Sequence, residues 1–342
     1  MVQRLLQPGE IESLDHTAIP RLLLPHPGSL FSARAERLRN LAAGNVHGIP
    51  VEEALRGYLS LMAAVADAQA VVVADLGRDG VPLPDESAMA LAHEHNMPPL
   101  PATGERPAAW RDVFTRLLDA LAAAKDAPPQ LAAALDTLRA TEGAELEGIA
   151  DAILGTFDEG ADPLRAPFVA AALQVTWSVM AGQLDPAWAQ PLVTGTLCPV
   201  CGSHPVASVV RIGGQSQGYR YLHCSVCESE WHMVRVKCSH CESTAKVAYQ
   251  GLVGKDADPV AENKSAAKEG KTLDKANDPT KVARAETCDE CGTYRKIFNQ
   301  EHDFHVEPVA DDLASMMLDV LVSEAGYARA SGNPLLWLKE GA

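Results

Sequence analysis

The sequence predicts a multidomain α plus small β protein: an N-terminal α-helical domain, two consecutive zinc-ribbon metal modules with four cysteines each, and a C-terminal helix. Three observations carry this prediction. Large apolar residues recur at helical spacing to about residue 184, and residues 198–300 alternate short β-prone runs with turns. All eight cysteines of the 342-residue chain lie in CxxC pairs in this second part.

The expected domain boundaries follow the same changes of pattern. They are an α-helical domain with an extended N-terminal arm at 1–187, a first tetrathiolate ribbon at 188–236, a second at 237–307, and a C-terminal helical segment at 308–342 that packs back on the body.

The N-terminal arm contains Pro8, Pro20, Pro25 and Pro27. Proline fixes φ and lacks the backbone donor, so we expect an extended arm until a helix begins at Ser32.

Stripes of large apolar side chains predict the core faces of antiparallel helices, and many alanines between them allow close helix packing. Two stripes are Trp110, Val113, Phe114, Leu117, Leu118 and Leu121, and Leu146, Ile149, Ile153, Leu154 and Phe157. The longest apolar stretch, 54–76, carries Arg56, Asp67 and Asp75, which favours a buried helix over a membrane span.

After Asp185-Pro186 the pattern is that of a small β module. The expected strands are Ser208–Ile212, Tyr219–His223, Trp231–Val236 and Lys246–Leu252. Residues 255–284 are charged and poor in large apolar side chains, which predicts a flexible insertion.

A final helix should begin near Asp311 and Asp312, because carboxylates suit the positive end of a helix dipole. Its predicted packing face is Leu313, Met316, Met317, Val320 and Leu321.

The candidate metal ligands are the four CxxC pairs. A CxxC turn places two sulfurs on one side of a tight loop, and two such turns give the tetrahedral S₄ geometry that zinc or iron prefers. The eight ligands are Cys198, Cys201, Cys224, Cys227, Cys238, Cys241, Cys288 and Cys291.

Two pairings of these turns are open. Successive pairs are separated by 22, 10 and 46 residues, and consecutive pairing gives two ribbons, with the Gly-rich hairpin 213–218 inside the first. The interleaved pairing would join the middle pairs and leave the outer pairs 86 residues apart. We favour consecutive pairing.

Glycine directly follows the second cysteine at Gly202 and Gly292, whereas Glu228 and Glu242 stand there in the other two turns. Each consecutive site therefore combines one turn of each kind. Closed four-sulfur sites are usually structural, and electron transfer is the alternative. The nearby histidines His223, His232 and His240 are not needed as ligands and should lie beside the sites or on the surface.

Composition narrows the function. A formal charge of −16 opposes nucleic-acid binding. The first residues show neither an export signal nor a twin arginine, so we expect a cytoplasmic protein. No Ser/His/Asp or paired-carboxylate spacing stands out from ordinary surface charge, so we expect that the protein is not an enzyme.

The chain resembles the FdhE family of formate dehydrogenase accessory proteins over roughly residues 198–336. The residues that carry the resemblance are Cys198–Ser203, Arg220–Cys227, Trp231, Cys238–Cys241, Glu286–Cys291, Tyr294, Asp311–Ala314, Gly326-Tyr327 and Asn333-Pro334. The insertion 255–284 departs from the simple pattern. Glu228 and Glu242 also replace the glycine found in both turns of rubredoxin.

The resemblance implies a cytoplasmic protein that acts on the catalytic subunit of respiratory formate dehydrogenase before export, with rubredoxin-like sites for two metal ions. Iron is the leading expectation and zinc the alternative. Two rival functions stay open: an iron–thiolate redox protein acting on that subunit, and a zinc-ribbon nucleic-acid binder. Homodimerisation is also open.

Overall fold

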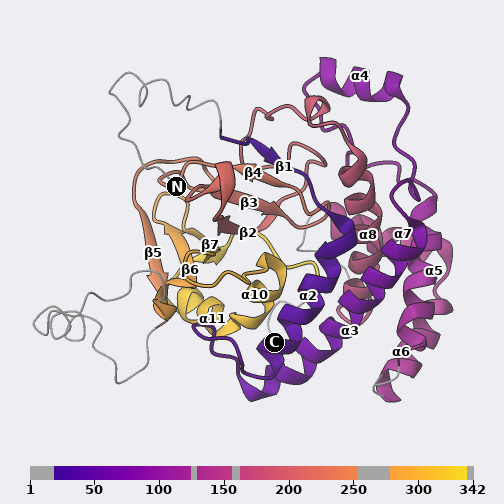
Figure 1. Ribbon diagram of the computed structural model, residues 1–342, viewed down its shortest axis with the longest axis horizontal. Coiled ribbons are helices and arrows are strands. Elements are labelled where there is room, and N and C mark those ends of the chain that lie inside the picture. The colour runs from indigo at the N-terminus through magenta and orange to yellow at the C-terminus, as the bar shows by residue number, and fades with distance from the viewer. Residues whose placement is uncertain (1–18, 125–128, 156–161, 253–277, 337–342) are drawn as a thin grey trace, which may run out of the picture.

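The computed structural model describes residues 19–124, 129–155, 162–252 and 278–336. It has a helical layer on one side and a mixed β-sheet on the other, with helix α10 (Pro308–Ala314) between them (Figure 1). This confirms the predicted helical region followed by a small β region.

The helical layer is built around α8, which is buried on every side over Ala166–Ala181. Helices that are apolar all round belong inside a core. The described helices are α2 (Pro27–Ala42), α3 (Glu53–Leu76), α4 (Glu86–Glu94), α5 (Ala109–Ala122), α6 (Pro129–Arg139), α7 (Gly143–Gly155), α8 (Ala166–Gln183), α10 (Pro308–Ala314) and α11 (Met316–Glu324).

Both predicted apolar stripes lie in this core. All six residues of the first are buried on α5, and the second is buried on α7 except for Phe157, which lies outside the described residues. The long apolar helix α3 packs on α2, α5 and α8, and half of its most apolar window is buried. By length and composition this helix could cross a membrane, but a buried core helix of a soluble protein can meet the same two criteria.

The prediction that the first helix begins at Ser32 is wrong, because α2 begins at Pro27. Proline suits the first helical turn, where its missing N–H has no intrahelical acceptor to lose. Of the arm before it, the described residues 19–26 contain strand β1 (Leu22–Leu23), which pairs with β4 (Glu230–His232) at the edge of the sheet.

The sheet has the strand order β1-β4-β3-β2-β7-β6-β5, and β8 also pairs with β7. Its other strands are β2 (Pro205–Val210), β3 (Arg220–Cys224), β4 (Glu230–His232), β5 (Val247–Gly251), β6 (Ala283–Cys288), β7 (Thr293–Asn299) and β8 (Ala328–Arg329). The predicted strands correspond to β2, β3, β4 and β5 with shifted ends.

The sheet contains one arrangement twice. In each half, a CxxC turn precedes a first strand, which pairs antiparallel with a second strand, and another CxxC turn leads into a third. The halves are β2-β3-β4 and β5-β6-β7, and they join through parallel pairing of β2 with β7. The two ribbons therefore share one continuous sheet.

The predicted flexible insertion does not extend to residue 284. Residues 253–277 lie outside the described residues, but 278–284 form a short 3-10 helix (Pro279–Lys281) and the start of β6. Val282 is buried at 1% exposure, so this segment is part of the core despite its charged neighbours.

The predicted face of the last helix is right at Leu313, which is fully buried, but wrong at Val320 and Leu321. The chain breaks at Ser315 into α10 and α11, so a single helical period does not run through both. Leu318 and Val322 are the buried residues of α11, whereas Val320 and Leu321 are about half exposed.

Asp311 and Asp312 are buried, and ion pairs from distant elements compensate their charge. Arg37 of α2 donates to Asp311 at 2.6 Å, and Lys296 of β7 lies 3.1 Å from Asp312. The helix dipole favours a carboxylate in the first turn but gives no reason for it to be buried. The ion pairs with Arg37 and Lys296 make the burial of these two carboxylates possible.

Candidate metal centres

The turns that carry the cysteines share one backbone geometry. In three of them the N–H of the first cysteine donates to the carbonyl of the serine five residues later, at 2.8–3.0 Å. In the fourth, Cys288 pairs with Thr293 in the β6–β7 register. The chain thus repeats the motif C-x-x-C-[G/E]-[S/T], a sequence signal that the count of CxxC pairs alone had missed.

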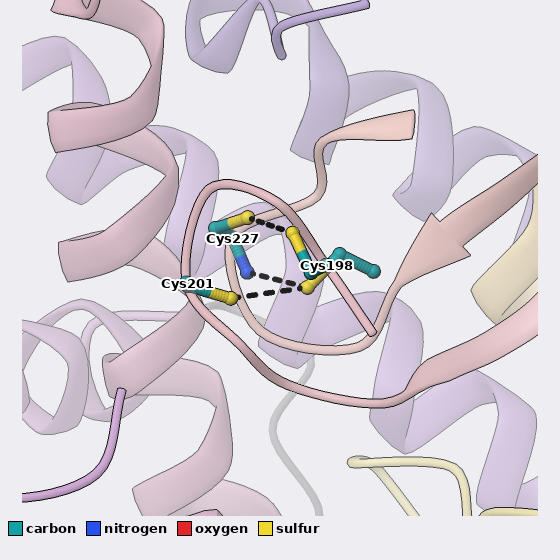
Figure 2. Close-up of side chains that lie close together, drawn as sticks. Cys198, Cys201 and Cys227 are labelled. Atoms are coloured by element: carbon teal, nitrogen blue, oxygen red, sulfur yellow. Dashed lines mark hydrogen bonds between the residues drawn. The ribbon is translucent and has the colours of Figure 1, made fainter. Parts of the chain in front are cut away.

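The first cluster joins the turn before β2 to the turn between β3 and β4. Cys198 Sγ lies 3.5 Å from Cys227 Sγ, and Cys201 Sγ lies 3.4 Å from Cys224 Sγ. Figure 2 shows the labelled side chains Cys198, Cys201 and Cys227 converging between the two turns. All four cysteines are buried, none exposed by more than 2%.

The second cluster repeats this arrangement with wider spacing. Cys238 Sγ lies 3.9 Å from Cys291 Sγ, and Cys241 Sγ lies 3.8 Å from Cys288 Sγ. Cys238 and Cys288 are buried, Cys291 is partly buried and Cys241 is exposed. Consecutive pairing is therefore confirmed, and the two centres differ in their access to solvent.

Both clusters fit a tetrahedral metal–thiolate site. A metal–sulfur bond of about 2.3 Å implies sulfurs about 3.8 Å apart, which matches the second cluster and is slightly wider than the spacings in the first. The N–H of Val226 and that of Cys227 each lie 3.4 Å from Cys224 Sγ, and the N–H of His240 lies equally far from Cys238 Sγ. Such contacts favour sulfur in its anionic form.

Without a bound cation, most cysteines of the first cluster would stay protonated as neutral thiols. Burial raises the pKa of Cys198, Cys224 and Cys227 well above its ordinary value. Burial also acts to raise the pKa of Cys201, but hydrogen bonds from the other three thiols lower it. A divalent cation bound to all four sulfurs would stabilise their thiolate forms and offset half of their charge.

The residue after the second cysteine needs a left-handed backbone. Gly202 and Gly292 have φ of 79° and 68°, and Glu228 and Glu242 have almost the same values, 63° and 62°. A non-glycine residue in this region is strained unless its surroundings hold it. The two glutamates therefore replace glycine without changing the path of the turn.

Glu228 is held by a buried network that reaches the helical layer. Arg34 of α2 donates to Glu228 at 2.7 Å and to Glu307 at 2.8 Å, and both atoms of the Arg34–Glu228 pair lie on side chains with 0% exposure. His223 lies between Glu228 and Glu230, at 2.7 Å from each. Arg211 pairs with Glu230 at the far end.

The pKa values in this network favour charged forms. Burial alone would lower the pKa of His223, but its two glutamate partners raise it to about 9. Burial alone would raise the pKa of Glu230, but Arg211 and His223 lower it to about 2. Sequence reasoning placed His223 beside the site and missed Arg34, whose role depends on partners 194 and 273 residues away.

Glu242 has weaker support at the second centre. It accepts a hydrogen bond from the N–H of Gly195 at 2.8 Å and pairs with Lys237, and both side chains are about one third exposed. The predicted neighbours His232 and His240 are in neither cysteine cluster. His232 instead packs edge-on against Tyr219 and Tyr221.

Comparison with known proteins gives one family across the chain. The matching family models are the FdhE N-terminal region at residues 19–194, the FdhE central domain at 197–235 and the FdhE C-terminal domain at 236–336. The cysteines of the first centre fall in the central domain and those of the second in the C-terminal domain.

Relatives and a solved structure agree. A protein named "Protein FdhE homolog" from Pectobacterium atrosepticum is 40% identical over 93% of this chain and 91% of its own length. "Protein FdhE" from Escherichia coli O9:H4 is 37% identical over 97% and 96%. The crystal structure of the FdhE protein from Pseudomonas aeruginosa has a TM-score of 0.72 and 35% identity, covering 94% of this chain and 100% of that one.

These matches extend the resemblance from the cysteine-bearing half to the helical half, and the chain belongs to the FdhE family of formate dehydrogenase accessory proteins.

Proposed function

We propose that this chain is a non-enzymatic accessory protein that binds the catalytic subunit of formate dehydrogenase in the cytoplasm, before that subunit is exported. Family membership over nearly the whole chain is the observation that carries the proposal. The acidic charge of −16 speaks against the rival nucleic-acid role, since phosphate binding relies on Lys and Arg.

The eight cysteines would hold two metal ions, with iron as the leading candidate and zinc as the alternative. Support comes from the convergence of four sulfurs at each of two centres, with spacings close to those of a tetrahedral site. A closed tetrathiolate site supplies structural cross-linking, and with iron it can also carry one electron.

The helical layer and the first centre would act together as one recognition platform. The Arg34 network ties α2 to the turn at Glu228, and Gln174 of α8 donates to the carbonyl of Ser225 at 3.0 Å. A partner that contacts both layers would therefore meet a fixed relative arrangement of the two.

Affinity capture tests the proposal. The full chain, tagged and produced together with the catalytic subunit, should retain that subunit after washing. Arg34→Gln should weaken retention, because it loosens the junction between the layers. Val193→Ala is the matched control, since Val193 is 99% exposed and the change should leave capture intact. If the unaltered chain never retains the subunit, with or without air, the proposed function is wrong.

A redox role is the second candidate, and the exposure of Cys241 favours it, because electron transfer needs a centre near the surface. An absorption spectrum of protein purified without air and then exposed to air separates the candidates. Ferric tetrathiolate is intensely coloured, whereas zinc has no such transitions. A colourless protein with two zinc ions would eliminate the redox role and leave the binding role untouched.

A further inference from the structure

The two cysteine centres have the same donor set and the same turns, yet their surroundings differ. The first has four buried cysteines, whereas the second has Cys241 exposed and Cys291 partly buried. Since the ligands are chemically identical, any difference in reactivity must come from access and from the bonds that hold each turn.

The first centre is enclosed by the helical layer. The N–H of Leu100 donates to the carbonyl of Val200 at 3.0 Å, and that of Ala102 to the carbonyl of Cys201 at 2.9 Å. Gln174 holds the carbonyl of Ser225 in the other turn. An incoming molecule reaches these sulfurs only if such tertiary bonds open first.

The second centre is anchored as well, but its sulfurs stay accessible. The N–H of Ala328 donates to the carbonyl of Gly292 at 2.8 Å, and Arg295 donates to Ser239 Oγ at 3.0 Å. None of these bonds has to break for a solute to touch Cys241, because that residue is already exposed. Its nearest flanking ion pair, Lys237 with Glu242, is itself partly exposed.

We propose that the second centre is an exchangeable metal site and that Cys241 is the thiolate first replaced by an incoming thiol, whereas the first centre exchanges its metal much more slowly and acts as a structural cross-link. The inference rests on the proposed metal binding by both clusters. In the exchange step, the incoming sulfur forms a bond to the metal, the bond from the metal to Cys241 Sγ breaks, and the proton of the incoming thiol passes to Cys241. The oxidation state of the metal does not change.

The ligand class follows from the donor chemistry. A soft metal ion bound by thiolates exchanges one of these ligands most readily for another thiolate. The site would therefore take a thiol-bearing molecule or the cysteine of a partner protein in preference to a carboxylate or a phosphate. A partner protein whose cysteine binds in this way would lie against the exposed edge of the second ribbon.

Zinc release tests the difference between the centres. The full chain loaded with two zinc ions is mixed with excess 4-(2-pyridylazo)resorcinol, and the coloured zinc complex is followed over time. We expect two phases of equal size, with the second on the order of 100-fold slower, since three tertiary hydrogen bonds must open at the first centre. Adding glutathione should accelerate only the fast phase, and adding acetate should not.

Alkylation assigns the phases without any variant. Iodoacetamide applied to the zinc-loaded chain, followed by peptide mapping, should label Cys241 and Cys291 before the cysteines of the first centre. Gln174→Leu provides a second assignment, because loss of its bond to Ser225 should speed only the slow phase.

Each outcome has one interpretation. Equal release rates at both centres, or earliest labelling at Cys198 to Cys227, would overturn the inference about exchange. A chain that binds fewer than two zinc ions would instead overturn the assignment of all eight cysteines as ligands, so the two failures are distinguishable.

Discussion

Replacing Arg34 by methionine tests the junction between the helical layer and the first metal centre. The change removes the cation that pairs with Glu228 at 2.7 Å and Glu307 at 2.8 Å, inside a site where Arg34 has 0% exposure. Methionine fills similar space on α2 but donates no hydrogen bond. Two buried carboxylates then lose a shared partner.

The expected cost is large. Removing one partner of a buried ion pair typically destabilises a protein by about 3–5 kcal/mol, because the remaining charge stays buried. His223 and the N–H of Ala310 still contact the two glutamates, so we expect a value near the lower end of this range. Adding Glu228→Gln should recover about 1 kcal/mol or more, since the pair is coupled.

Arg39→Met is the matched control on the same helix. Arg39 pairs with Asp67, but the two side chains are 54% and 51% exposed. Exposed pairs contribute about 0–1 kcal/mol. The free energy of unfolding is measured on metal-loaded protein in guanidinium, by tryptophan fluorescence and circular dichroism, and the two probes must give the same midpoint. An Arg34→Met variant no less stable than Arg39→Met would refute the stabilising role of the network.

Three further predictions follow from the sites. Glu230→Gln should make the free energy of unfolding depend less on pH in the acid range. In the folded protein the pKa of Glu230 is about 2, below its ordinary value of 4.5, so this group stabilises the fold above pH 4.5 and the contribution is lost as the pH falls. The wild type should therefore lose roughly 1.4 kcal/mol from Glu230 between pH 6 and pH 3.5, and the variant should not. The free energy of unfolding is measured by guanidinium titration at each pH, and the same pH dependence in the wild type and the variant would contradict this prediction. Cys198→Ser and Cys241→Ser should each reduce bound metal from two ions to about one by elemental analysis, with the helical layer still folded; a variant that keeps both ions would show that its cysteine is not a ligand. Glu242→Gly should stay within about 1 kcal/mol of the wild type, because relief at φ 62° offsets a partly exposed pair, whereas Glu228→Gly should lose about 2 kcal/mol or more with its buried partners. Equal thermal shifts for these two variants would contradict the contrast.

The sequence alone was sufficient for features whose cause is local. A CxxC turn is specified by residues adjacent in the chain, so the four cysteine turns could be predicted from the sequence. Their spacing favoured consecutive pairing, and the structure decided it. The stripe from Trp110 to Leu121 was equally clear, because helical periodicity operates within one segment. The motif C-x-x-C-[G/E]-[S/T] was also present in the sequence and marks the left-handed position in every turn.

Only the tertiary structure decided which charges are buried. Arg34 and Asp311 look like solvent-facing residues on helices, yet each is fully buried by partners from elsewhere in the chain. The same holds for the parallel pairing of β2 with β7, which merges the ribbons into one sheet, and for the exposure of Cys241 beside the enclosure of Cys201. Local spacing fixes which atoms can bind a metal, whereas the stability of a buried charge and the access to a sulfur depend on elements far away in the sequence that pack against them.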